Sequence, residues 1–100
     1  MSADSKLIVI AVITAIDGHQ YDLRAAQEKL VAETRMEKGC ELYELNQSLD
    51  DSRILIFVER WTTEADWKAH MEGSAVANFR ASGAPKWVES QQLHRMTGVA

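Results

Sequence analysis

Cysteine is nearly absent from this 100-residue chain, and the one that is present, Cys40, has no partner for an internal disulfide. A disulfide framework of the kind found in small secreted proteins is therefore excluded, and we expect a reducing, cytoplasmic location. Proline is also scarce, with Pro85 alone, and the five glycines form no low-complexity run. These features are typical of an ordered globular protein, and the length suits a single domain.

Basic residues are too few and too scattered to form a phosphate-binding stripe, and the net charge is −4. We therefore expect no nucleic-acid partner. His19, His70 and His94 fall in separate elements without metal-ligand spacing, so no metal site is expected. Gly73 and Gly83 stand alone, which argues against a phosphate-binding glycine loop.

Long hydrophobic runs are missing as well, and the longest candidate, Leu7–Ile16, is about half of a membrane span. The weakly charged leader and the bulky Ile13 also disfavour a signal peptide. The run is rich in β-branched residues, which favours a buried strand and no membrane association.

Hydrophobic periodicity and turn residues organise the rest of the chain. Apolar residues recur on one helical face between Leu23 and Thr34, and Gly39 is a suitable helix terminator. Thr63 with Asp66 resembles a capping box, which starts a second helix. In chain order, we predict a strand at Lys6–Ala15, a helix at His19–Lys38, strands at Glu41–Ser48 and Arg53–Trp61, a helix after Thr63 with a short helical segment at Ala75–Ala81, and a strand at Trp87–Met96.

The order β-α-β-β-α-β predicts an α+β, ferredoxin-like fold, a four-stranded antiparallel sheet with its helices on one face. We expect one domain over residues 1–100, with its core at about 6–96. The first and third strands do not alternate with polar residues, so the second sheet face also needs an apolar cover. A second copy of the chain is the simplest cover, and we expect a homodimer with the site between that exposed face and the helices that close its ends.

An ordered set of short motifs runs from the end of the first helix into the second. It comprises Arg35–Cys40, Tyr43–Leu45, Asp50–Asp51, Glu59–Trp61, Glu64–Ala65 and His70. With this set the chain resembles the antibiotic biosynthesis monooxygenase family, small dimeric α/β-barrel proteins that include quinol monooxygenases. The likeness covers roughly residues 6–96.

The resemblance implies paired sheets that enclose a pocket, and oxidation of phenols or hydroquinones by molecular oxygen with neither metal nor flavin as cofactor. Some relatives instead isomerise small signalling molecules or degrade haem. The chain departs from the family pattern at Lys38, where proline is common, and at Ala75, where many members carry a second histidine. The first strand also lacks the asparagine of the haem-degrading relatives, so haem degradation is not expected.

Three residues are candidate catalytic groups. His70 titrates near neutrality and would act as a general base for a phenol, unless it is a packing histidine. Tyr43 would orient a second substrate oxygen, or pack as a large hydrophobe with a wet tip. Glu59 is a charge within an apolar strand, which indicates either a catalytic carboxylate or an ion pair with Arg60, Arg35 or a partner subunit.

Two aromatic residues are candidate substrate-binding groups. Trp61 would form a wall on which a flat ring stacks, or would fill the core at the sheet end; Phe57 would line the same pocket. Glu37 is expected mainly to stabilise the helix end, and Trp67 and Phe79 to belong to the core.

The function that this set favours is a cofactor-independent monooxygenase acting on a small phenol or hydroquinone. Two alternatives remain open: a non-catalytic dimer that binds a small apolar ligand, and an isomerase of a small signalling metabolite. The lack of clustered basic residues counts against the isomerase if its substrate is phosphorylated.

Overall fold

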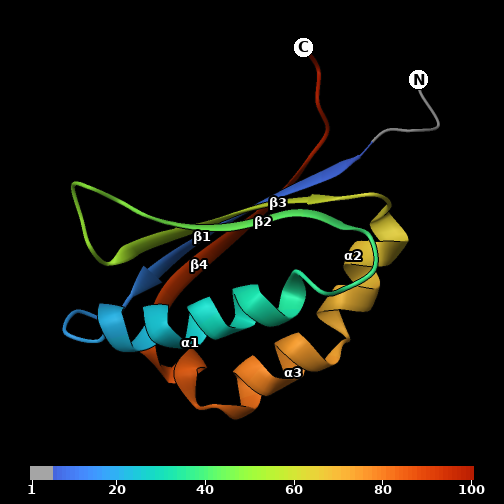
Figure 1. Ribbon diagram of the computed structural model, residues 1–100. Coiled ribbons are helices and arrows are strands. Elements are labelled where there is room, and N and C mark those ends of the chain that lie inside the picture. Colours follow the sequence, from blue (N-terminus) through green and yellow to red (C-terminus); the bar gives the residue numbers. More distant parts are fainter. Residues whose placement is uncertain (1–5) are drawn as a thin grey trace.

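A computed structural model describes residues 6–100 as one sheet with helices packed against a single face (Figure 1). Neighbouring strands are all antiparallel, and their order is β2-β3-β1-β4. The strands are β1 (Leu7–Ala15), β2 (Cys40–Gln47), β3 (Ile54–Trp61) and β4 (Val88–Met96). The α+β, ferredoxin-like fold class is thereby confirmed, with β1 and β3 in the middle of the sheet.

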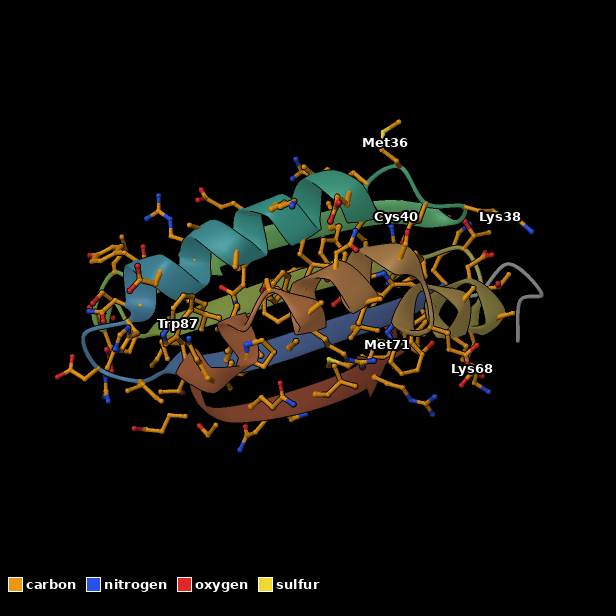
Figure 2. The ribbon with its side chains drawn as sticks, turned by 90° about the horizontal axis from the view of Figure 1, so that it is seen from below. Met36, Lys38, Cys40, Lys68, Met71 and Trp87 are labelled. Atoms are coloured by element: carbon orange, nitrogen blue, oxygen red, sulfur yellow. The ribbon has the colours of Figure 1, made fainter. Side chains whose placement is uncertain are left out.

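Two helices lie side by side beneath the sheet, and β4 runs along the edge beyond them (Figure 2). These are α1 (Gln20–Thr34) and α3 (Ser74–Ala81), while α2 (Glu64–Met71) closes one end of the sheet. A 3-10 turn, η1 (Ala84–Trp87), connects α3 to β4. No helix within residues 6–100 has the length and apolarity needed to cross a membrane.

The core forms between the helices and the inner sheet face, because side chains along a strand alternate between faces. On β3 the inward side chains are Leu55, Phe57, Glu59 and Trp61, all of them buried. They meet an apolar stripe of α1 and the inward side chains of β1, of which Val9 lies opposite Glu59 in the register. A carboxylate therefore sits within an otherwise apolar layer.

On the opposite sheet face, the two central strands β1 and β3 carry six aliphatic side chains, and no helix within residues 6–100 covers them. We call this set the outer apolar face; its members are Ile8, Ile10, Val12, Ile54, Ile56 and Val58. All six remain partly exposed. We expected both faces of β1 and β3 to be covered, and within a single chain only the inner face is.

Helix α1 ends at Thr34, earlier than the expected Lys38. The chain turns instead, with the Glu37 amide donating to the Thr34 carbonyl oxygen at 2.9 Å. Gly39 adopts φ +79°, and a side chain there would collide with Asp66 at the start of α2. Gly39 is therefore needed for the turn into β2 and for the close approach of α2. It does not terminate α1, which has already ended at Thr34.

The second helical region follows the sequence prediction at its start and departs from it later. The Thr63 hydroxyl accepts a hydrogen bond from the Asp66 amide at 3.1 Å, which confirms the cap. Gly73 interrupts the helix as expected. The turn η1 was not expected; it follows Gly83, whose φ of +85° reverses the chain, and contains Pro85 in its first positions.

Candidate active site

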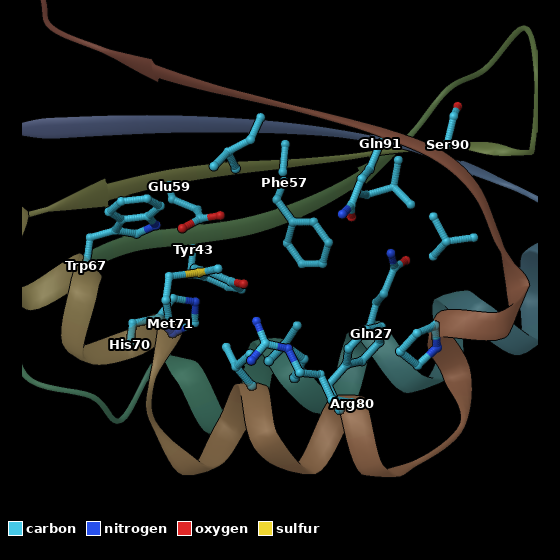
Figure 3. Close-up of a pocket in the computed structure, with 18 of the residues that line it drawn as sticks. Gln27, Tyr43, Phe57, Glu59, Trp67, His70, Met71, Arg80, Ser90 and Gln91 are labelled. Atoms are coloured by element: carbon cyan, nitrogen blue, oxygen red, sulfur yellow. The ribbon is translucent and has the colours of Figure 1, made fainter.

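A pocket of about 750 Å³ lies between the sheet and the helices of the same chain (Figure 3). Tyr43, Phe57, Glu59 and His70 all line it. We expected the site between the exposed sheet face and the helices that close its ends, whereas the candidate residues line a pocket on the helix-covered face. The candidates on β2 and β3 occupy inward positions of their strands, so they point away from the outer apolar face.

His70 is held by a short hydrogen bond to a carboxylate from the turn after α1. Its Nδ1 lies 2.6 Å from Glu37 Oε1, although the two residues are 33 positions apart. His70 is 3% exposed, and the Glu37 side chain is 22% exposed. Because Glu37 accepts the proton on Nδ1, Nε2 of a neutral His70 keeps its lone pair.

The surroundings of His70 favour this neutral form. Burial lowers the pKa of the imidazole below its usual 6.5, and the hydrogen bond and charge of Glu37 act in the opposite direction. Two rings fix the plane of the imidazole: the centroids of Trp61 and Tyr43 lie 4.8 Å and 5.4 Å from it. A buried, oriented and uncharged histidine has the properties of a proton acceptor.

Tyr43 extends from β2 into the same end of the pocket and contacts Phe57 at a centroid distance of 5.4 Å. Burial, aided by the negative charge of Glu59, raises the pKa of its hydroxyl above the ordinary 10.0. Tyr43 therefore stays protonated across the physiological range, and its O–H is a hydrogen-bond donor to a bound molecule.

Glu59 is 4% exposed, and no basic side chain within residues 6–100 forms an ion pair with it. The expected pairs with Arg60 and Arg35 are not formed: Arg60 pairs with Glu41, and Arg35 donates to the Tyr43 carbonyl oxygen. The only side-chain donor to Glu59 in this part of the chain is Trp61, whose Nε1–H lies 2.9 Å from Oε1. Burial raises the pKa of Glu59 to about 7.

The raised pKa of Glu59 has a consequence for stability. Because its folded-state pKa lies above the usual 4.5, it contributes stability below about pH 4.5 that is lost as pH rises through about 7. We expect Glu59→Gln, which keeps an acceptor for Trp61, to raise the thermal midpoint at pH 8.5 by roughly 5 °C or more and to change it little at pH 5. Glu72→Gln, at an exposed position after α2, is the control and should behave like wild type at both pH values. Equal effects of Glu59→Gln at both pH values would contradict a buried, titrating carboxyl.

Trp61 does not form the aromatic wall that the sequence suggested. It is completely buried, does not line the pocket, and packs behind His70 and Tyr43. A ring cannot stack on a face that is already covered, so Trp61 supports the site from behind. The tryptophan that lines the pocket is Trp67 on α2, which we had assigned to the core (Figure 3).

Gln27, which was not among the predicted site residues, is 1% exposed and lines the pocket from α1. The signal was present, because Gln27 falls on the same helical stripe as Leu23 and Leu30. Arg80, Gln91 and the half-exposed Leu93 also line the pocket, and all three side chains are exposed to solvent.

Comparison with known proteins agrees with this architecture. The structure of PA3566 from Pseudomonas aeruginosa is similar over 100% of both chains, with 28% identity and a TM-score of 0.90. That of SO0527 from Shewanella oneidensis is 29% identical over 95% of this chain and 92% of the other, with a TM-score of 0.87. A structure described as an antibiotic biosynthesis monooxygenase shares the fold at 21% identity and a TM-score of 0.86, covering 94% of this chain and 99% of the other. None of the curated proteins matches the sequence.

The family model for antibiotic biosynthesis monooxygenases matches residues 6–82. The match extends from β1 through α3 and so includes Tyr43, Glu59 and the His70–Glu37 pair. The chain therefore belongs to the antibiotic biosynthesis monooxygenase family.

Proposed function

We propose that this protein is a cofactor-independent monooxygenase that oxidises a phenol or hydroquinone with molecular oxygen. The observation that carries the proposal is the His70–Glu37 pair, 2.6 Å apart, at a pocket that Tyr43 and Glu59 also line. Membership in a family of monooxygenases supports the reaction type.

The proposed chemistry needs little from the protein beyond proton transfer and exclusion of water. His70 Nε2 takes a phenolic proton while Glu37 stabilises the imidazolium that forms. The Tyr43 hydroxyl donates to the second substrate oxygen, and the dry pocket strengthens that hydrogen bond. The electron-rich anion then reduces O₂, and one of the two oxygen atoms leaves as water. In a hydroquinone the other oxygen atom enters the ring as a hydroxyl on the resulting quinone, and in a phenol it becomes the second carbonyl oxygen of the quinone.

Glu59 is suited to the second half of this reaction. With a pKa of about 7, its carboxyl is present in both protonation states near neutral pH. It can therefore deliver a proton to reduced oxygen or remove one from the ring carbon that has gained oxygen. The two titrating groups have environments that shift their pKa values in opposite directions, since burial lowers that of His70.

Oxygen uptake tests the proposal. We expect the protein to consume one O₂ per hydroquinone oxidised, at a rate well above autoxidation and without added metal or flavin. Naphthohydroquinones and phenols of similar size suit a pocket of about 750 Å³, which lies in the range that holds drug-sized ligands. Tight binding of these compounds without any uptake would contradict the enzyme and favour a ligand-binding module.

The isomerase alternative gains no support from the pocket. Among the lining residues that belong to the described range 6–100, only Arg80 carries a permanent positive charge, and Arg80 is itself exposed. A phosphorylated signalling metabolite would need a denser set of cationic donors.

We further propose that the functional unit is a homodimer assembled through the outer apolar face. This face places Ile10 beside Val58 and Val12 beside Ile56 in the centre of the sheet, with polar residues such as Glu44 and Gln92 on the flanking strands. An apolar centre with a polar rim is the pattern of a protein interface, and a twofold axis makes such a patch complementary to itself.

A further inference from the structure

The indole of Trp61 contacts each of the three acid–base candidates, although it does not line the pocket. Its Nε1–H donates to Glu59 Oε1 at 2.9 Å. Its ring centroid lies 4.8 Å from that of His70 and 6.3 Å from that of Tyr43. Trp61 has no exposed surface. Because an indole N–H is a donor only, a buried tryptophan needs an acceptor, and here the acceptor is a carboxyl of the pocket.

The two oxygens of the Glu59 carboxyl have different surroundings. Oε1 accepts from Trp61, whereas no donor within residues 6–100 forms a hydrogen bond with Oε2. Two buried side-chain atoms in this part of the chain lack both a partner and accessible surface, and they are Gln27 Oε1 and Thr34 Oγ1. Glu59 Oε2 is not one of them, so it keeps accessible surface. Since Glu59 is 4% exposed and lines the pocket, that surface faces the pocket, into which Figure 3 shows the carboxyl directed.

The hydrogen bond from Trp61 makes the two oxygens chemically unequal. An N–H at Oε1 stabilises negative charge on that oxygen, so a proton that binds the carboxyl prefers Oε2. Burial raises the pKa of Glu59 to about 7, and the hydrogen bond from Trp61 acts in the opposite direction. Both forms of the carboxyl are therefore present near neutral pH, and the protonated form carries its proton on the pocket side.

Other titratable groups do not override this arrangement. Those around Glu59 come from β2, from α2 and from the turn after α1, and they are Cys40, Tyr43, His70 and Glu37. Burial keeps the thiol, the phenol and the imidazole uncharged near neutral pH, and Glu37 is engaged by His70. The neighbour of Glu59 on β1 is the apolar Val9. The state of the carboxyl thus depends mainly on its burial and on Trp61.

We propose that Trp61 is a positioning residue that holds Glu59 Oε1 and thereby keeps the transferable proton of the carboxyl on Oε2, the oxygen that faces the pocket. The effect on turnover rests on the proposed function, in which Glu59 gives or takes a proton at the substrate. The position of the proton does not, because it requires no substrate. Without the indole, the carboxyl could turn about its last bond and carry its proton away from the pocket.

The indole N–H signals of the wild type test the proposal without any substitution at Trp61. The chain has three tryptophans, so a proton–nitrogen correlation spectrum of protein with isotope-labelled tryptophan is simple to assign, with Trp67→Phe and Trp87→Phe identifying the other two signals. The Trp61 signal should move with a midpoint near pH 7 and stay protected from exchange with water on both sides of it, because Oε1 accepts in both states. In Glu59→Gln it should stay protected and no longer move. In His70→Asn, which replaces the ring packed on the indole, the movement should persist.

Trp61→Phe keeps an aromatic ring at this position and removes the N–H. Loss of a hydrogen bond to the charged form should raise the midpoint of the Glu59 titration by about one pH unit. The carboxyl band in the infrared spectrum measures it, with the matching protein that also carries Glu59→Gln as the blank. A tryptophan with a packing role alone would lower the thermal midpoint of the protein and leave this titration unchanged. Trp87→Phe, which removes an indole outside the pocket, is the control and should titrate like the wild type.

The outcomes separate the role of Trp61 from the proposed function. A Trp61 signal that does not titrate near pH 7, that loses its protection when Glu59 is protonated, or that still moves in Glu59→Gln overturns the assignment. An unchanged Glu59 midpoint in a folded Trp61→Phe also overturns it; if that variant does not fold, the spectra of the wild type and Glu59→Gln decide. A protected signal that titrates with Glu59 supports the assignment even without oxygen uptake, and in that case only the oxygenase proposal fails.

Discussion

His70→Ala should lower the rate of oxygen uptake by roughly 10²–10⁴-fold, the usual contribution of a positioned proton acceptor. The reason is geometric: Glu37 holds Nδ1 at 2.6 Å, so Nε2 is the nitrogen left for the substrate. His70→Asn is a second variant. The asparagine amide can still donate a hydrogen bond to Glu37, but it has no basic nitrogen that could accept the substrate proton. Both should fold, bind phenols and lose turnover, as measured with an oxygen electrode alongside circular dichroism.

The pH dependence of the wild type should report the same group. Burial lowers the pKa of His70 below 6.5, so protonation of this acceptor should lower the rate below that pH, separately from any change that the titration of Glu59 causes near pH 7. Glu37→Gln removes a charge that raises the pKa of His70, so the acid limb should move to still lower pH while the maximal rate falls. His19→Ala, which changes an exposed histidine outside the pocket, should leave the profile unaltered. Near-normal uptake by His70→Ala in a folded protein would transfer the role of base to Glu59.

Ile56→Glu should convert the proposed dimer into a monomer. Ile56 lies in the middle of the outer apolar face, opposite Val12, and burying an unpaired carboxylate in an apolar seam costs several kcal/mol. Sedimentation equilibrium at micromolar concentration should give about twice the chain mass of 11.2 kDa for the wild type and the single chain mass for the variant. Ile56→Val, which keeps the apolar surface, is the control and should remain dimeric.

A neighbouring position distinguishes assembly from folding. Leu55 is completely buried on the inner face, so Leu55→Glu should unfold the chain, whereas Ile56→Glu leaves the core between sheet and helices intact. A wild-type protein that is a stable, folded monomer at micromolar concentration would contradict the proposed interface.

Much of the fold was accessible from local sequence signals. The β-branched run of β1, the Thr63 cap and the interruption at Gly73 each depend on neighbouring residues alone, and each was predicted correctly. The end of α1 was not, because Gly39 is required by the approach of Asp66, a contact between segments distant in the sequence. Local propensity cannot report such a contact.

The site was less accessible for the same reason. The residue types of His70, Tyr43 and Glu59 identified them as candidates, but the face on which a strand residue lies depends on what the helices cover. Tertiary packing brings His70 and Glu37 together. It also decides that Trp67, and not Trp61, lines the pocket. Glu59 is an example. Its charge within an apolar strand could be recognised from the sequence, but the sequence did not reveal that Arg60 pairs with Glu41 and that Arg35 donates to the Tyr43 carbonyl oxygen.

The alternation of side chains along β3 also bears on how this protein can evolve. Phe57 and Glu59 face the pocket, while Ile56 and Val58, directly beside them, face outward. Substitutions at one set can thus alter substrate preference without disturbing the other, so new specificities are open to selection on a constant scaffold. Insertion or deletion of a single residue within β3 would exchange the two sets, exposing the carboxyl and burying aliphatic groups in the pocket. We therefore expect changes in chain length to fall in loops such as residues 48–53, and divergence within β3 to proceed mainly by replacement.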